Sequence, residues 1–248
     1  MKRNIEKHQV DPTFEQAYLK ARAKEQRILS AAQIKQLPYL SNHPLAKEWQ
    51  LRQKSTERFL AYVRNKEVST LMDLGCGNGW LTHKLAPLVD KIEAIDVNQT
   101  ELEQAAEVLK AFTNVQIKCC DIFSTQITNR FDLILVNGAV QYFPDFSLLM
   151  ERLFELLTAT GEIHILDSPF YHTKDIANAK ARSDAYYESI DTPNMKPFYH
   201  HHSWDDLFNF KYQKLYDPSS FLRKLGNRIG RKDSPFPWIK ISHAEIIV

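Results

Sequence analysis

Short apolar runs and longer segments with helical spacing alternate through the middle of the chain. The helical segments are expected near residues 79–88, 99–112 and 145–158, and Thr160-Gly161 is expected to stop the last of them. The apolar runs cover residues 70–74, 92–97, 115–119, 131–136 and 162–166. Alternation of this kind predicts a parallel sheet with helices on both faces.

The two ends of the chain follow a different pattern. Residues 11–36 and 44–66 are predicted to be helices, because apolar positions recur at helical spacing and prolines mark their starts. The aromatic segment at about 170–205 is long for a simple connection, which favours a lid, and residues 177–187 within it predict a helix. Two late apolar stretches predict strands near 212–216 and 238–241. We therefore expect an N-terminal helical segment at 1–67 that serves as a cap, and a main domain at 68–248 with an insertion at about 170–205.

Composition narrows the class of protein. The chain has 248 residues, of which 44% are hydrophobic and 25% charged, as in ordinary globular domains. No apolar stretch approaches the ~18 residues of a membrane helix, and the basic N-terminus has no apolar segment behind it. The three cysteines, Cys76, Cys119 and Cys120, are a poor disulfide framework. A reduced, cytoplasmic protein without a membrane partner is expected.

Charge is distributed unevenly along the chain. Residues 1–67 carry 14 basic and 7 acidic side chains, whereas residues 68–167 carry 6 basic and 14 acidic ones. The simpler interpretation is a solvated helical face docked on an acidic body. The alternative is attraction of an anionic substrate or a nucleic acid.

The sequence LMDLGCGNGW at residues 71–80 contains three of the seven glycines in the chain. A glycine-rich turn after a parallel strand lies where ligands bind in open α/β folds. The phosphate-loop motif needs a lysine directly after its last glycine, but the next lysine here is Lys84. The dinucleotide motif needs a third glycine at position 80, which is Trp80. Asp73, two residues before Gly75, would repel a pyrophosphate and suits a ligand with an amino group and a positive charge.

Acidic residues also end the next two predicted strands. Asp96 follows Gly75 by 21 residues, a spacing suited to accepting both hydroxyls of a ribose. Asp121 is placed to accept a hydrogen bond from the exocyclic amine of adenine. The ligand predicted from Asp73, Asp96 and Asp121 has an amine, a ribose diol and an adenine amine, and no phosphate. The alternatives are that Asp73 and Asp96 cap helices and that Asp121 is an ordinary turn aspartate.

Four motifs now stand in order: DLGCGNG, the acid Asp96, the Asp121 turn and FDLILVNGAVQYFPD. Over about residues 68–167 the chain resembles class I S-adenosylmethionine-dependent methyltransferases. The resemblance implies an α/β, Rossmann-like, doubly wound seven-stranded sheet of order 3-2-1-4-5-7-6 with the last strand antiparallel. N-terminal helices and a lid insertion after strand five would complete it. It also implies S-adenosyl-L-methionine as cofactor and S-adenosyl-L-homocysteine as product, with no metal.

The resemblance assigns residues to parts of the cofactor. The methionine part would contact Asp73, Gly75, Cys76, Gly77, Asn78 and Gly79, the ribose Asp96, the adenine Val97, Asp121 and Ile122, and the sulfonium region Asn137. Cys76 is expected to be a small loop residue and not a nucleophile. Arg52 is placed to fold over the site and pair with the cofactor carboxylate, the alternative being a surface arginine.

The acceptor side is less determined, and no single catalytic residue is predicted. Candidate bases are His200, His201 and Tyr142, because histidine titrates near neutral pH. Candidate acceptor contacts are Gln141, Tyr142, Tyr171 and His200. A metal site at His200, His201 and His202 is disfavoured because successive side chains diverge. Ser203 after them is expected to cap a helix.

The sequence VNGAVQ stands where DNA amino-methylases of this class carry N/D-P-P-[YF], and it lacks the cysteine of cytosine-C5 enzymes. The predicted function is therefore methyl transfer to oxygen or nitrogen of a small-molecule acceptor by direct in-line displacement. The alternatives are an RNA (tRNA) methyltransferase, favoured by the basic N-terminal segment and residues 223–232, and a non-catalytic cofactor-binding scaffold. A nicotinamide dehydrogenase is disfavoured by Trp80.

Overall fold

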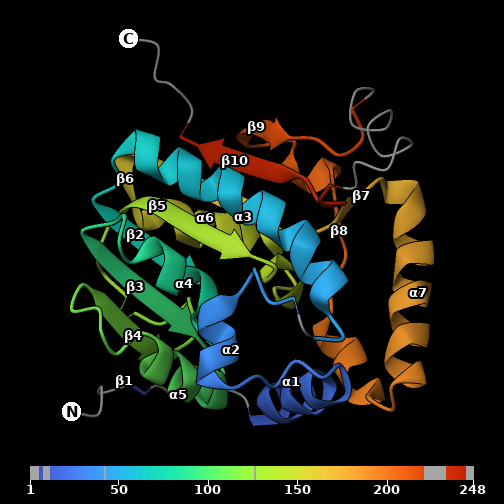
Figure 1. Ribbon diagram of the computed structural model, residues 1–248. Helices are drawn as coiled ribbons and strands as arrows, with labels where there is room; N and C mark the ends of the chain where they lie inside the picture. Colours follow the sequence, from blue (N-terminus) through green and yellow to red (C-terminus); the bar gives the residue numbers. More distant parts are fainter. Residues whose placement is uncertain (1–5, 8–11, 42, 126, 221–232, 244–248) are drawn as a thin grey trace.

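The computed structural model describes residues 6–7, 12–41, 43–125, 127–220 and 233–243. Its main sheet has eight strands in the order β1-β4-β3-β2-β5-β6-β10-β9 (Figure 1). The strands are β1 (Glu6–Lys7), β2 (Thr70–Leu74), β3 (Lys91–Asp96), β4 (Val115–Cys119), β5 (Phe131–Asn137), β6 (Leu157–Leu166), β9 (Lys211–Tyr216) and β10 (Trp238–Ser242). β10 runs antiparallel to both of its neighbours, β6 and β9. Apart from β1, which was not predicted, this is the order 3-2-1-4-5-7-6, so the fold prediction is confirmed.

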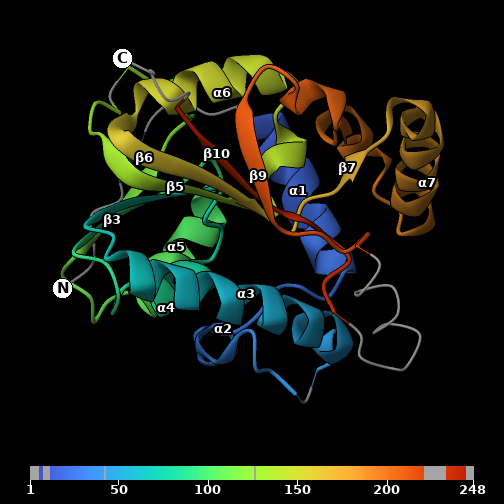
Figure 2. The same cartoon turned by 90° about the horizontal axis from the view of Figure 1, so that it is seen from above.

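Helices cover both faces of the sheet and divide the core into two layers. The helices α3 (Ala46–Lys66), α4 (Trp80–Leu85) and α5 (Gln99–Val108) lie on one side, and α6 (Phe146–Glu155) lies on the other (Figure 2). Successive residues of a strand point to opposite faces. Leu71 therefore packs in the α3 layer and Met72 in the α6 layer, and both side chains are fully buried.

The helix predicted over residues 11–36 is in fact two helices. α1 (Pro12–Lys24) and α2 (Ala31–Gln36) are separated by a turn in which Gln26 has a φ of 57°. Ser30 begins α2 with a reciprocal capping box, since its hydroxyl accepts from the amide of Gln33 and the Gln33 side chain accepts from the amide of Ser30. The predicted start at Asp11 lies outside the described residues. The break frees α1 to cross the end of the sheet.

Gly161 does not stop a helix, contrary to the sequence prediction. It lies inside β6, opposite the irregular pairing of that strand with Phe131 and Leu133 in β5. A Cβ atom at residue 161 would lie 2.7 Å from the carbonyl oxygen of Phe131. The glycine therefore permits close approach of two strands at a bulge, where the sequence pattern suggested a helix end.

The insertion after β6 contains the predicted helix, α7 (Ile176–Ser189). Its other elements are β7 (Phe170–Tyr171), η2 (Thr173–Asp175), η3 (Pro193–Phe198), β8 (His202–Ser203) and η4 (Asp205–Leu207). Ala17 and Ala21 of α1 pack with Tyr187 and Met195 in a small separate core. The hydroxyl of Tyr186 also donates to Glu25, at 2.7 Å. α1 and the insertion are thus joined to one another.

Within the described residues, no helix combines the length and the apolar character needed to cross a membrane.

Candidate functional site

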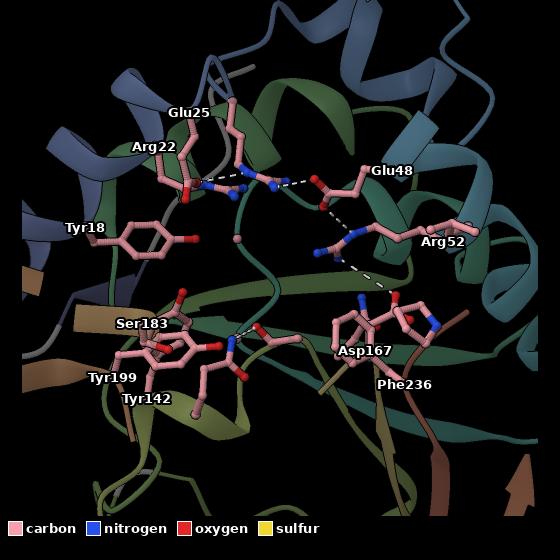
Figure 3. Close-up of a pocket in the computed structure, with 18 of the residues that line it drawn as sticks. Tyr18, Arg22, Glu25, Glu48, Arg52, Tyr142, Asp167, Ser183, Tyr199 and Phe236 are labelled. Carbon is pink, nitrogen blue, oxygen red and sulfur yellow. Dashed lines mark hydrogen bonds and ion pairs between the residues drawn. The ribbon is translucent and has the colours of Figure 1, made fainter. Parts of the chain in front are cut away.

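A cavity of about 550 Å³ opens at the carboxyl ends of β2 and β5. Its floor is the turn from β2 to α4, which contributes Gly75, Cys76, Gly77 and Asn78, and Asn137 and Gly138 extend it at the end of β5. Side chains of α1, α3 and the insertion form the walls (Figure 3). This is the edge of an open α/β sheet at which ligands bind.

Asp96 lies against this floor at the end of β3. Its two carboxylate oxygens accept hydrogen bonds from the amides of Gly77 and Asn98, each at 2.8 Å. Burial, and then the nearby charge of Glu101, raise the pKa of Asp96 to about 7. Glu101 is itself buried and accepts from Nε of Arg22 at 3.4 Å. Asp96 itself is not among the residues that line the cavity, so its contact with a ribose stays a prediction.

Asp73 is placed behind the glycine turn and does not line the cavity. Its buried carboxylate accepts from the hydroxyl of Thr82 at 2.6 Å, and burial raises its pKa to about 6. This contact ties β2 to α4 and so shapes the turn. Direct contact of Asp73 with a cofactor stays a prediction.

The residues predicted to surround the adenine also lie outside the cavity lining. Asp121 is exposed, and its side chain accepts from the amide of Phe123 at 2.9 Å, as in an ordinary Asx turn. Ile122 is buried in the α6 layer and Val97 is half-buried. The adenine contacts therefore stay predictions.

Gly79, assigned to the methionine part, also lies outside the cavity lining. It has a φ of 74° and serves as the N-cap of α4.

Arg52 of α3 lines the cavity, so it is not the plain surface arginine of the alternative interpretation. Its Nε atom donates to Glu48 at 3.1 Å, and its Nη1 atom lies 3.8 Å from a carboxylate oxygen of Asp167. The guanidinium also stacks 5.4 Å from the ring centroid of Trp49. Figure 3 shows Arg52 and Glu48 on the opposite side of the cavity from Tyr18 and Tyr142.

The candidate acceptor residues divide into two groups. Gln141, Tyr142 and Tyr171 line the cavity, and their contact with an acceptor stays a prediction. The candidate bases His200 and His201 do not line it. The backbone amide of His200 donates to the carbonyl of Gln141 at 2.7 Å, and Nε2 of His201 lies 2.9 Å from the hydroxyl of Ser183. Neither residue is among those that line the cavity, although the ring of His201 contacts the lining residues Tyr171 and Tyr199. Their role as bases stays a prediction.

His202 is buried, and its Nε2 atom lies 3.0 Å from the carbonyl oxygen of Val140. Burial lowers the pKa of His200, His201 and His202 alike. Ser203 caps the short η4 helix, because its hydroxyl accepts from the amides of Asp205 and Asp206 at 3.1 and 3.2 Å. The histidine run therefore joins the insertion to the loop after β5, through Gln141 and Val140.

The sequence predicted that the N-terminal segment and the insertion cover the site, but several residues of the walls were not among the predicted site residues. They are Tyr18, Arg22, Glu25, Glu101, Tyr187 and Tyr199, all of which line the cavity. A signal for the first three was present, because Tyr18, Arg22 and Glu25 recur at i, i+4 and i+7 and share one helical face. The contact of Arg22 with Glu101 of α5 could be identified only from the fold.

Three buried polar atoms of the cavity-lining residues have no hydrogen-bond partner in the described part of the chain. They are Oδ1 of Asn78, Oε1 of Gln141 and Nε1 of Trp49. Nε2 of Gln141 donates to the carbonyl of Gly138 at 2.6 Å, which fixes the orientation of that amide. Buried polar atoms are normally hydrogen-bonded. The floor and walls therefore fit a polar ligand with both donors and acceptors, as S-adenosylmethionine has.

Comparison with known families agrees with this geometry. The family described as "Methyltransferase domain" matches residues 65–214, more than half of the chain. The chain belongs to this methyltransferase family.

Relatives of this chain are named as methyltransferases of different substrates. It is 27% identical over 122 residues to malonyl-[acyl-carrier protein] O-methyltransferase of Acetivibrio thermocellus, covering 46% of this chain and 43% of that protein. It is 31% identical over 102 residues to the Bacillus anthracis protein of the same name, covering 40% and 37%. It is 27% identical over 121 residues to phosphoethanolamine N-methyltransferase 1 of Zea mays, covering 47% and 24%. The chain thus spans less than half the length of these relatives.

Solved structures share the fold. The YcgJ protein of Bacillus subtilis superposes with a TM-score of 0.58 at 13% identity, covering 77% of this chain and 99% of that one. The DhpI-SAM-HEP complex superposes with a TM-score of 0.56 at 14% identity, covering 95% and 100%.

Proposed function

We propose that this protein is an S-adenosylmethionine-dependent methyltransferase that transfers a methyl group to oxygen or nitrogen of a small-molecule acceptor. The observation that carries the proposal is the Gly75–Asn78 turn at the cavity floor, whose Gly77 amide donates to the carboxylate of Asp96. The unpartnered polar atoms of Asn78 and Gln141 add support, and the names of the relatives favour a small acceptor.

The residues of the chain divide the work of binding and orientation. Asp96 would hold the ribose, the Gly75–Asn78 turn the methionine part, and Arg52 the cofactor carboxylate. When bound, S-adenosylmethionine supplies a methyl group that is already activated on a sulfonium. The chain then needs to align the acceptor and exclude water, and alignment alone is worth roughly 7–11 kcal/mol of the barrier. The N-terminal segment at 1–67 and the insertion at about 170–205 would act as the cover.

The RNA alternative has less support from the structure. The basic stretch at 223–232 lies outside the described residues. Arg22, Arg27 and Arg52 of the basic N-terminal segment line the cavity and pair with acids there. They do not form an outward-facing strip that would follow a phosphate backbone.

Isothermal titration tests the cofactor class. We expect wild-type protein to bind S-adenosylhomocysteine with a micromolar Kd and to give no heat with NAD⁺ or ATP. Trp80 replaces the third glycine of the dinucleotide motif, and the phosphate-loop lysine is missing. Circular dichroism confirms that the protein is folded. Absence of S-adenosylhomocysteine binding by folded protein would contradict the proposal, and preferential binding of NAD⁺ would support the dehydrogenase alternative.

The binding of S-adenosylhomocysteine is expected to depend on pH. Ribose hydroxyls donate to an ionised carboxylate, so Asp96, with a pKa of about 7, must lose its proton when the ligand binds at lower pH. Affinity should therefore fall about tenfold from pH 8 to pH 6. The variant Glu101→Gln removes a like charge and should move the midpoint to lower pH. A Kd that stays constant from pH 6 to pH 8 in the wild type would rule out this role of Asp96.

A further inference from the structure

The four carboxylates that line the cavity are all engaged by donors of the protein. Glu25 accepts from Arg27 at 2.9 Å and Glu48 from Arg27 and Arg52 at 2.5 and 3.1 Å. Glu101 accepts from Arg22 at 3.4 Å. Asp167 accepts from Ser55 at 2.9 Å and lies 3.8 Å from Arg52. These acids are thus neutralised, and they do not favour a cationic acceptor.

Hydrogen-bond donors, in contrast, are in surplus around the same space. Four tyrosine hydroxyls of the cavity lining have no hydrogen-bond partner among the described residues: those of Tyr18, Tyr171, Tyr187 and Tyr199. Figure 3 shows Tyr18 pointing from α1 into the cavity. Burial raises the pKa of all four phenols, so that they remain protonated and can donate.

Arginine side chains add further free donors to this surplus. Arg22 uses only its Nε atom in the contact with Glu101, which leaves both terminal guanidinium nitrogens for a ligand. Arg182 of α7 also lines the cavity and has no ion-pair partner within the described residues. Four arginines and four carboxylates line the cavity, so their formal charges balance. The free hydroxyls and guanidinium nitrogens therefore fit a ligand that accepts several hydrogen bonds, and an anionic oxygen is the strongest acceptor for them.

The cavity also lacks a group that could remove a proton from the acceptor. No histidine or lysine is among its lining residues in the described part of the chain, and its carboxylates are paired. An alcohol must lose a proton during transfer, and an ammonium group must lose one before it can attack. A carboxylate or phosphonate is already ionised at neutral pH and needs no base.

We propose that the acceptor is a small organic acid and that its anionic oxygen receives the methyl group, with Tyr18, Tyr199 and Arg22 binding the acid. This inference rests on the proposed function. One oxygen of the acid forms a bond to the methyl carbon while the carbon–sulfur bond breaks, and the electron pair of that bond goes to sulfur. The acid loses one negative charge, the sulfonium becomes a neutral thioether, and no proton is transferred. The aromatic rings around Tyr142 favour an acid with an apolar body.

Matched acceptors of nearly equal size test the proposal. Phenylacetate, benzylphosphonate, phenylethanol and phenylethylamine, with succinate as an aliphatic acid, are each incubated with protein and methyl-tritiated S-adenosylmethionine. Binding of each compound to protein saturated with S-adenosylhomocysteine is measured by titration calorimetry. We expect the acids to bind and to be methylated, and the alcohol and amine to give neither signal.

The chemistry of the product identifies the source of the oxygen. A methyl ester of a carboxylate releases tritiated methanol in mild alkali, whereas a phosphonate monomethyl ester and an N-methyl product do not. Methylation of the amine or the alcohol would overturn the proposal, and so would absence of both binding and methylation for all the acids. Intact S-adenosylhomocysteine binding in either case would leave the proposed function standing. Failure to bind S-adenosylhomocysteine would instead contradict the proposed function itself.

A pair of hydroxyl deletions tests the binding residues. The double variant Tyr18→Phe/Tyr199→Phe keeps both rings and is expected to raise KM for the acid roughly 10- to 100-fold, because each lost bond was to a charged group. Its Kd for S-adenosylhomocysteine should not change. Arg22 is left intact because it also holds Glu101. Tyr39→Phe, at an exposed tyrosine outside the cavity, is the matched control and should leave KM unchanged. An unchanged KM in the double variant would overturn the assignment of these tyrosines.

Discussion

Replacing Asp96 with alanine is expected to weaken the binding of S-adenosylhomocysteine by about 3 kcal/mol, which corresponds to roughly a 100-fold rise in Kd. The carboxylate now accepts from the amides of Gly77 and Asn98, at 2.8 Å each, and lies beside the floor of the cavity. Its loss would remove the acceptor for two ribose hydroxyls and would also loosen the turn. Titration calorimetry measures the change in Kd.

Asp90→Ala is the matched control, because Asp90 is exposed and precedes the opposite end of the same strand, β3. Its Kd should equal that of the wild type. Thermal unfolding of both variants separates a binding effect from a general loss of stability. Equal affinity of Asp96→Ala and wild type, in folded protein, would remove Asp96 from the cofactor site.

Replacing Gly75 with alanine is expected to lower the free energy of unfolding by about 3 kcal/mol. Two causes combine. Gly75 has a φ of 72°, which costs an L-residue about 1–2 kcal/mol. A Cβ atom there would also lie 2.5 Å from Cβ of Ala139, and such overpacking costs about 1–3 kcal/mol. Urea unfolding monitored by circular dichroism measures the loss.

Gly138→Ala separates the two causes. Gly138 has a φ of 61°, but a Cβ atom there would find its nearest neighbours at 3.7 Å, an ordinary contact distance. This variant should lose only about 1 kcal/mol. Adding Ala139→Gly to Gly75→Ala removes the overlapping methyl group and should recover part of the loss in a double-mutant cycle. Equal losses for Gly75→Ala and Gly138→Ala would show that Ala139 moves aside at no cost.

The central sheet could be predicted because each of its strands carries its own local signal. Residues 70–74 and 115–119 appear as strands with the predicted bounds, since apolar runs between turn residues leave little ambiguity. The break between α1 and α2 could not be predicted from spacing, because the apolar periodicity continues across Gln26. Gly161 misled for a related reason, since a helix stop and a strand bulge both use glycine.

The cofactor side of the site was more predictable than the acceptor side. Asp96 and the Gly75–Asn78 turn are close together in the sequence and follow the adjacent strands β3 and β2. Their contact therefore follows from the topology of the sheet. Tyr18 and Tyr199 are 181 positions apart and both line the cavity only because α1 packs on the insertion. A contact of such long range leaves no periodic signal in either segment. Three consecutive histidines suggested a catalytic base, yet the side chains of His201 and His202 contact Ser183 and Val140 and do not line the cavity.

The crossing of α1 over the cavity has an evolutionary consequence. The match to the family begins at residue 65, so Tyr18 and Arg22 of this wall lie outside the matched residues. Changes in α1 alter what the wall recognises without disturbing the Gly75–Asn78 turn. Choice of acceptor and use of cofactor can thus diversify independently, and close relatives of the shared domain need not act on the same compound.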